Sequence, residues 1–231
     1  MLVYSVFIIL LIIVIVNFNF NFNNIIEYFN IEFNLDKNNK ILIDKKCKHS
    51  GSGFNDKHEL GECSVAYQII PYVNNVLEIG GGTGKVSHNI NIILQKKGIG
   101  NKHIVIEPGL RGNGNHGDKH IYINKKKFND KYTIIPKLAN ELTKEDLKIL
   151  DFKPDCLYAD CEGCLLDFCK SEIGKYILNS VRYIINEMDG FAIHKDLDNE
   201  LRKIWCNYNF KKIATGYGCG ISCDTEIWEK L

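Results

Sequence analysis

Hydrophobic and polar positions divide the chain into an apolar beginning, a polar stretch and a region of alternating short elements. Residues 1–16 read MLVYSVFIILLIIVIV with no charge, and Asn then alternates with Phe as far as residue 23. A polar stretch follows and contains the turn-rich HSGSGFNDKH at 49–58. We therefore predict three parts: a hydrophobic anchor or signal segment at 1–24, a linker or irregular cap at 25–60, and a folded domain at 61–231.

The folded domain alternates short apolar runs with segments whose apolar residues recur at helical spacing. Strands that alternate with helices form a mostly parallel sheet that is covered on both faces. The predicted fold is therefore α/β: a Rossmann-like, mostly parallel seven-stranded sheet with helices on both faces and a C-terminal antiparallel hairpin, preceded by an N-terminal hydrophobic helix. We predict strands at 76–80, 103–107, 132–136, 156–160 and 181–187, helices at 62–72, 84–97, 143–150, 164–178 and 195–207, and a hairpin of 210–216 with 225–231.

The apolar N-terminal segment approaches the roughly 20 residues that a membrane-spanning helix needs. A secretory signal would have a basic start and a small-residue cleavage site, and neither is present, since no Lys or Arg precedes Lys37. We predict an uncleaved membrane anchor, with a cleaved signal as the alternative. The positive charges that follow the segment, beginning with Lys37 and Lys40, favour a cytosolic domain. A secreted or lumenal domain is the alternative.

Charge and cysteine content narrow the partners and the compartment. Lys plus Arg number 29 and Asp plus Glu number 28, so the net charge of +1 lacks the basic excess of a nucleic-acid-binding protein. Nine cysteines, an odd number, in a chain with a substantial core do not resemble a small disulfide scaffold. We expect no nucleic-acid partner and mostly reduced thiols, and nothing in the sequence indicates an oligomeric state.

A glycine-rich loop follows the first predicted strand of the domain. The sequence VLEIGGGTGKVS places Gly80, Gly82 and Gly84, with Gly81 between them, where a strand passes into a helix. Glycine allows both a turn with positive φ and a close approach of the backbone to a ligand. Glu78 stands two positions before the first glycine. A carboxylate there suits a cofactor with a positive ammonium group better than it suits a phosphate.

Glu107 ends the next predicted strand, 23 residues after Gly84. A carboxylate at this place can accept hydrogen bonds from both hydroxyls of a ribose. Dinucleotide-binding loops favour the spacing G-x-G-x-x-G, and the last interval here is one residue shorter. The loop and the two acids together indicate S-adenosyl-L-methionine as the cofactor, with Glu78, Gly80, Gly81, Gly82, Gly84 and Glu107 as its binding residues.

Three downstream blocks resemble the FkbM-like family of Class I S-adenosylmethionine-dependent methyltransferases. HIVIEPG (103–109) is similar to the family's E-P strand end, PDCLYADCEGCLLDF (154–168) to its D-x-E-G block, and RYIINEMDG (182–190) to the strand that follows. The resemblance implies methyl transfer, usually to oxygen, on small molecules or glycans. The chain departs from the family pattern at Gly81-Gly82-Thr83, where the family often has an Ala-Asn pair, and at Leu165, where it commonly has Glu.

The same resemblance implies that Asp160 and Glu162 face the transfer site. Methyl transfer mainly requires alignment, and a hydroxyl acceptor also needs a base or a metal to remove its proton. We predict Asp160 and Glu162 as catalytic or acceptor-binding residues, although Glu162 is alternatively a cap of the following helix. For Glu187 and Asp189, after the next strand, a solvated turn is the better interpretation.

Metal sites are not expected. His116, Asp118 and His120 alternate in a glycine-rich loop and would share one side of an extended segment, but short runs of this kind usually face solvent. Cys161-x-x-Cys164 and Cys219-x-x-x-Cys223 have spacings that zinc ligands use, yet zinc at the first pair would crowd the cofactor. Free buried thiols are the preferred interpretation of these cysteines.

The sequence therefore predicts a membrane-tethered S-adenosylmethionine-dependent methyltransferase that acts on a hydroxyl group of a small molecule or glycan. Two alternatives remain. One is an NAD-dependent oxidoreductase or epimerase on a similar fold, and the other is a non-catalytic cofactor-binding protein.

Overall fold

The computed structural model describes residues 31–47, 60–98, 100, 102–108, 118–190, 196–218 and 223–231. The chain forms two compact units, Met1–Glu32 and Phe33–Leu231. The predicted hydrophobic segment at 1–24 lies outside the described residues, so its membrane role stays a prediction. Among the described residues, no helix combines the length and the apolar character needed to cross a bilayer.

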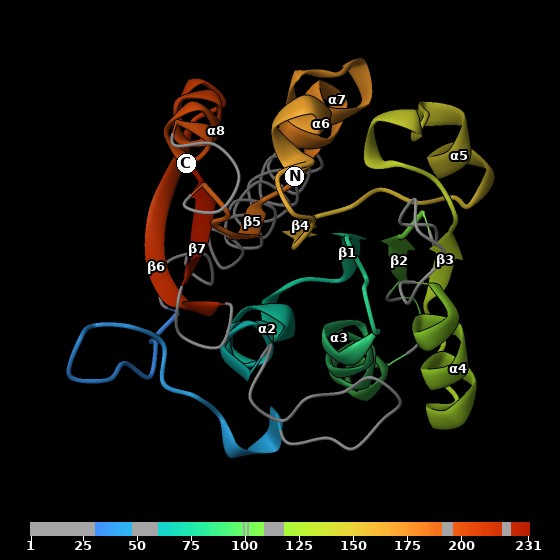
Figure 1. Ribbon diagram of the computed structural model, residues 1–231, viewed down its shortest axis with the longest axis horizontal. Coiled ribbons are helices and arrows are strands. Elements are labelled where there is room, and N and C mark those ends of the chain that lie inside the picture. The colour runs from blue at the N-terminus through green and yellow to red at the C-terminus, as the bar shows by residue number, and fades with distance from the viewer. Residues whose placement is uncertain are drawn as a thin grey trace, which may run out of the picture. The chain divides into compact units, whose positions relative to one another are not determined.

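Seven strands in the order β3-β2-β1-β4-β5-β7-β6 form one sheet in the second unit (Figure 1). The first five of these are parallel to one another, whereas β7 is antiparallel to both β5 and β6. The predicted fold class is confirmed by this topology. The strands are β1 (Asn75–Ile79), β2 (Lys102–Ile106), β3 (Thr133–Ile135), β4 (Cys156–Ala159), β5 (Tyr183–Glu187), β6 (Phe210–Gly218) and β7 (Cys223–Lys230).

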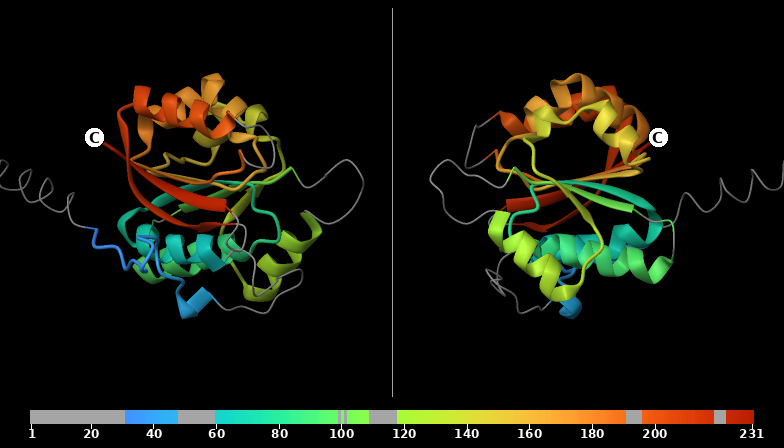
Figure 2. Two further views of the ribbon diagram at one scale, coloured as in Figure 1. Left: turned by 60° about the vertical axis from the view of Figure 1, so that its left-hand side comes forward. Right: turned by 90° about the vertical axis from the view of Figure 1, so that its right-hand side faces the viewer.

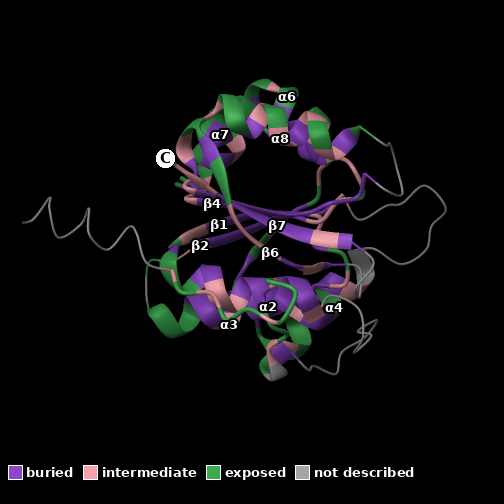
Figure 3. Cartoon of the chain, turned by 90° about the vertical axis from the view of Figure 1, so that its left-hand side faces the viewer, coloured by how far each residue is buried: buried purple, intermediate pink, exposed green. Residues whose placement is uncertain are grey.

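Helices cover both faces of the sheet, as Figures 2 and 3 show. One face carries α2 (Leu60–Ile69), α3 (Lys85–Lys97) and α4 (Asp118–Phe128). The other carries α6 (Leu165–Lys170), α7 (Glu172–Ser180) and α8 (Leu197–Asn207), with α5 (Lys144–Ile149) beside β3 (Figure 1). Short 3-10 helices occupy Lys45–Cys47, Ile70–Tyr72 and Ala139–Glu141.

Alternation along the strands gives the two faces of the sheet different chemistry. Leu77 and Ile79 of β1 and Leu157 of β4 are buried in the hydrophobic core under α6, α7 and α8. The intervening positions point towards α2 and α3, and they include the polar residues Glu78 and Tyr158. Burial of the apolar face, at about 25 cal/mol per Å², drives folding, while the polar side chains of the opposite face require specific partners.

Two predicted elements need correction. Residues 118 onward form helix α4, so Asp118 and His120 do not alternate along an extended segment. Residues that are two positions apart on a helix, such as Asp118 and His120, do not lie on the same face. His116 lies outside the described residues. The single helix predicted at 164–178 is two helices, because Ser171 ends α6 and its hydroxyl accepts a hydrogen bond from the backbone N–H of Gly174 to begin α7.

Residues 33–47, within the predicted linker or cap, pack on the domain. The backbone N–H of Ile41 donates to the carbonyl of Thr215 on β6, and that of Asn34 donates to the Gln68 side chain on α2. A disulfide joins Cys47 to Cys63 of α2. This part of the chain is therefore tied to both the hairpin and the first helix of the domain.

The expectation of mostly reduced thiols is wrong. Disulfides join Cys47 to Cys63 and Cys161 to Cys164, and Cys223 is disulfide-bonded as well. Cysteine spacing cannot reveal such pairs in a chain of this size, because the partners are set by the tertiary fold. Among the described residues, the free cysteines are Cys156, Cys169 and Cys206.

Candidate active site

Four parallel strands end at one edge of the sheet and bring the predicted site residues together there. The glycine loop follows β1, Glu107 follows β2, Asp160 follows β4, and Glu187 is the last residue of β5. The register aligns these ends, since Ile79 pairs with both Ile106 and Ala159, and Ala159 pairs with Asn186. Ligands of open α/β sheets bind beyond such carboxyl ends.

The glycine loop has the backbone that the sequence predicts. Gly80, Gly82 and Gly84 have φ values of +86°, +51° and +82°, in the region where a side chain is strained. A Cβ on Gly81 would lie 2.5 Å from Cγ1 of Val105, so this glycine packs tightly against β2. Gly84 is the residue from which α3 begins.

Gly82 differs from its neighbours because it faces open space. A Cβ at this position would meet no atom within 4 Å, and the residue is exposed. Its backbone N–H donates to Oε2 of Glu107 over 2.9 Å. Glu107, with 8% of its surface exposed, therefore lies directly beside the exposed backbone of the loop.

Glu78 lies beneath the loop and is buried, with 1% of its surface exposed. One carboxylate oxygen accepts a hydrogen bond from the Ser87 hydroxyl over 2.7 Å, and the other lies 2.7 Å from Nε2 of His103. Ser87 belongs to the first turn of α3, so Glu78 links β1, β2 and the helix that the loop enters. Its predicted contact with the cofactor stays a prediction, and the observed contacts anchor the loop from below.

A second buried pair holds α3 from the side. Nδ1 of His88 lies 2.9 Å from Asp130, and the side-chain amide of Asn91 donates to the same carboxylate over 2.7 Å. Asp130 precedes β3, so these bonds tie the helix to the next parallel segment. A buried carboxylate that has two partners rigidifies the region behind the glycine loop.

Asp160 and Glu162 lie in the turn between β4 and α6. The backbone N–H of Asp160 donates to the carbonyl of Ile79, and the residue is partly buried at the edge of the sheet. Glu162 is exposed and has a positive φ of +54°. Cys164 stands at the N-cap position of α6, and its side chain makes no capping hydrogen bond. The alternative role of Glu162 as a cap of this helix stays a prediction.

Glu187 and Asp189 are buried, with 7% and 8% of their surfaces exposed, so the interpretation as a solvated turn is wrong. Burial, followed by the charges of Glu187 and Glu162, raises the pKa of Asp189 to about 7. The backbone N–H of Gly163 donates to Asp189 and acts in the opposite direction. The segment after β5 is thus part of the same acidic edge as the turn after β4.

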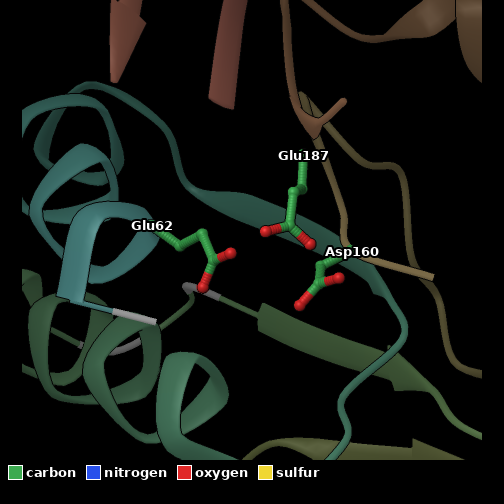
Figure 4. A group of neighbouring side chains, drawn as sticks. All are labelled: Glu62, Asp160 and Glu187. Carbon is green, nitrogen blue, oxygen red and sulfur yellow. The ribbon is translucent and has the colours of Figure 1, made fainter. Parts of the chain in front are cut away.

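Glu62, in the first turn of α2, joins this edge from the opposite side (Figure 4). Carboxylate oxygens of Glu62, Asp160 and Glu187 all lie within 4.8 Å of one another. Glu62 was not predicted as a site residue. The only available signal was a single acid in a helix that precedes the first strand, and such an acid usually complements the helix dipole.

The sequence matches no protein-family model and no curated protein, but its fold matches solved structures. A candidate O-methyltransferase from Klebsiella pneumoniae has a TM-score of 0.52 at 12% identity, over 73% of this chain and 79% of that chain. A candidate tRNA methyltransferase from Streptococcus pneumoniae, crystallised with S-adenosyl-L-methionine, has a TM-score of 0.51 at 12% identity, over 73% and 72%. The fold is that of Rossmann-like methyltransferases. At this identity the likeness concerns the fold, and the FkbM-like resemblance stays a prediction.

Within this fold, the predicted residues separate into three positions. Gly82 and Glu107 are together at the open side of the loop, Glu78 is underneath, and Asp160 lies across the edge. Gly80 connects the loop to Asp160, because a Cβ on Gly80 would lie 1.8 Å from the Asp160 carbonyl oxygen. The structure thus brings a ligand-accessible loop and an acidic edge into direct contact.

Proposed function

We propose that this protein is an S-adenosyl-L-methionine-dependent methyltransferase. The observation that carries the proposal is the open backbone at Gly82, whose N–H is held by Glu107. A ligand can lie against the loop there while its ribose hydroxyls donate to the carboxylate. The solved structure from Streptococcus pneumoniae, which shares the fold, was crystallised with this cofactor.

The charge of the edge supports a cationic cofactor. Glu107 follows β2, Asp160 follows β4 and Glu187 ends β5. Glu62 of α2 lies beside Asp160 and Glu187. The sulfonium and the ammonium of S-adenosyl-L-methionine are positive and are attracted by these carboxylates, whereas a pyrophosphate would be repelled. An NAD-dependent oxidoreductase or epimerase is therefore the weaker alternative.

The proposed reaction is methyl transfer to an oxygen nucleophile. The bond from sulfur to the methyl carbon breaks as the bond from the acceptor oxygen to that carbon forms, and S-adenosylhomocysteine leaves with the electron pair on sulfur. The proton of the acceptor hydroxyl passes to a base, and a neighbouring positive charge can lower the pKa of that hydroxyl. Asp160, across the edge from the loop, is the residue we assign to this task, with the exposed Glu162 beside it.

The acceptor we propose is a hydroxyl group of a small molecule or glycan. The FkbM-like blocks around Glu107 and Asp160 support this class. The net charge of +1 does not favour a nucleic-acid acceptor, which would call for a basic surface. A non-catalytic binding protein remains the second alternative, and turnover distinguishes it.

We also propose that the domain faces an oxidising compartment, anchored by the hydrophobic segment at 1–24. The disulfides of Cys47 with Cys63 and of Cys161 with Cys164 support this placement over a cytosolic one, because disulfides persist outside the cytosol. This proposal differs from the cytosolic orientation that Lys37 and Lys40, which follow the hydrophobic segment, favour. Alkylation of free thiols in intact cells, with mass-spectrometric detection at Cys47, tests it.

Isothermal titration of the full chain in detergent tests the proposed function. We expect saturable binding of S-adenosylhomocysteine and none of NAD. Saturable binding of NAD alone would overturn the proposal. Radiolabelled methyl transfer into extracts, with identification of the product by mass spectrometry, then defines the acceptor, and Asp160→Asn should reduce that turnover.

A further inference from the structure

Three carboxylates from separate elements converge beside the proposed cofactor loop. Glu62 comes from α2, Asp160 from the end of β4 and Glu187 from the end of β5, with oxygens within 4.8 Å of one another. Figure 4 shows the three side chains pointing towards a common space. Glu62 and Glu187 are almost fully buried, with 1% and 7% exposed. Negative charges so close together repel, and burial strengthens the repulsion, so the arrangement favours a positive ligand.

A buried hydroxyl at the same place is a second, independent indication of a ligand. Tyr158 is two residues before Asp160 on β4, so both side chains project from the same face of the sheet. Tyr158 pairs with Ile185, which places it on the face of Glu187 as well. The residue is 1% exposed, and its hydroxyl has no hydrogen-bond partner within the described part of the chain. A tyrosine hydroxyl buried in this way is normally satisfied by a protein group, water or ligand.

A disulfide-bonded cysteine lies next to each of the three carboxylate residues. Cys63, next to Glu62, is bonded to Cys47, and Cys161, next to Asp160, is bonded to Cys164. The disulfide-bonded Cys223 has its Sγ 3.0 Å from Oε1 of Glu187. The two disulfides restrain the segments that carry Glu62 and Asp160, and a restrained set of oxygens is what a metal site requires.

We propose that Glu62, Asp160 and Glu187 bind one hard divalent cation of the magnesium, manganese or calcium class. Such cations prefer carboxylate oxygens and commonly keep water or substrate oxygens in their remaining positions. The Tyr158 hydroxyl donates a hydrogen bond to an oxygen carried by the ion. This proposal departs from the sequence-based expectation that no metal is bound.

The cation extends the proposed function, although its binding does not depend on that function. A bound divalent cation lowers the pKa of a hydroxyl that coordinates to it, so it would activate the acceptor next to the donated methyl group. Asp160 would then hold the ion instead of acting as the base, and the proton of the acidified hydroxyl would pass to solvent water. Binding of the ion is measured without cofactor or acceptor, so failure of the two proposals can be told apart.

The experiment is a titration of Mn²⁺ into the full chain in detergent, without reductant, followed by the electron paramagnetic resonance of free Mn²⁺. We expect one saturable site, with competition by Mg²⁺ or Ca²⁺. Glu62→Gln should weaken Mn²⁺ binding by about tenfold or more, because affinity depends on ligand charge. Glu172→Gln is the matched control, since Glu172 is exposed on α7 with a side chain 86% accessible, and it should bind Mn²⁺ as the unmodified protein does.

The result that overturns the proposal is the absence of a saturable site in the unmodified protein, or equal affinity in the unmodified protein and Glu62→Gln. Tyr158→Phe provides a second variant that keeps the ring in the core, and it should weaken Mn²⁺ binding by a smaller factor. A titration with S-adenosylhomocysteine in EDTA runs in parallel. Cofactor binding without a Mn²⁺ site rejects only the cation, and a Mn²⁺ site without cofactor binding rejects only the methyltransferase.

Discussion

Gly80 and Asp160 are in backbone contact: a side-chain carbon on Gly80 would lie 1.8 Å from the Asp160 carbonyl oxygen. The loop after β1 and the turn after β4 therefore approach each other as closely as main chains can. This contact places the cofactor loop and the proposed acceptor-binding edge side by side. It also separates the roles of the glycines, because Gly80 is required by the fold whereas Gly82 faces open space.

Substitutions at these two glycines should have different effects. Gly80→Ala should destabilise the protein by about 3 kcal/mol or more, because the new methyl group overlaps the backbone and φ is positive. Gly82→Ala should cost only about 1–2 kcal/mol of left-handed strain while it blocks the approach of a ligand. Thermal unfolding and cofactor titration of both variants test this.

Gly98→Ala, at the other end of α3 and with nothing within 4 Å, is the control for strain alone. Unimpaired cofactor binding by Gly82→Ala would contradict the assignment.

Glu107 is the residue on which cofactor affinity should depend most. Glu107→Gln removes the charge that accepts the ribose hydroxyls, and hydrogen bonds to a charged group contribute about 1.5–3 kcal/mol. We expect the dissociation constant of S-adenosylhomocysteine to rise by about 10- to 100-fold, measured by isothermal titration. Glu145→Gln, on the exposed side of α5, should bind normally. An unchanged affinity in Glu107→Gln would place the ribose elsewhere.

The sheet could be predicted from the sequence because its signals are local. Each parallel strand is a short apolar run that ends at a glycine, a proline or an acid, and Gly80 and Glu107 mark two of these ends. The register of β1 with β2 places these two strand ends side by side at one edge of the sheet. Helix α4 was missed because the glycine-rich stretch before it, together with His116 and Asp118, resembles an extended loop.

The rest of the site depends on contacts between residues far apart in the sequence. Glu62 and Asp160 are 98 positions apart, and only the packing of α2 against the sheet brings them together. The pairing of Cys47 with Cys63 likewise follows from where the segment before α2 lies. Burial of Glu187 could not be predicted, because an acid at a strand end is exposed in one fold and covered in another.

The disulfide between Cys47 and Cys63 should stabilise the domain. It closes a loop with a sequence separation of 16, and a loop of this size contributes about 3 kcal/mol by restricting the unfolded chain. The double substitution Cys47→Ser with Cys63→Ser should lower the free energy of unfolding by about that amount, measured by urea denaturation. Cys206→Ser, at an exposed free cysteine, should leave it within about 0.5 kcal/mol. Equal stability of the double variant and the unmodified protein would contradict the bond.

Asp146 should make the stability of the domain depend on pH. Hydrogen bonds from Lys137, and then from Thr143, hold the pKa of Asp146 below its ordinary value. A lowered pKa in the folded state means that the contribution is complete above the unfolded pKa of about 4 and is lost as the pH falls through the folded value.

Replacement of the Asp146 carboxylate tests this dependence. Asp146→Asn should lower the free energy of unfolding by about 1 kcal/mol at pH 7, because the capping box with Thr143 is weakened. The difference from the unmodified protein should shrink at pH 3, measured by urea denaturation at both values. A difference that is equal or larger at pH 3 would show that the charge of Asp146 is not what stabilises the turn.

The most direct test is a crystal structure of the full chain with S-adenosylhomocysteine. We expect the ribose hydroxyls to lie within hydrogen-bond distance of Glu107, the ligand to pass over Gly82, and the sulfur to face Asp160. A structure in which no ligand lies against this loop at saturating S-adenosylhomocysteine, or in which a nucleotide diphosphate binds there instead, would contradict the proposed function.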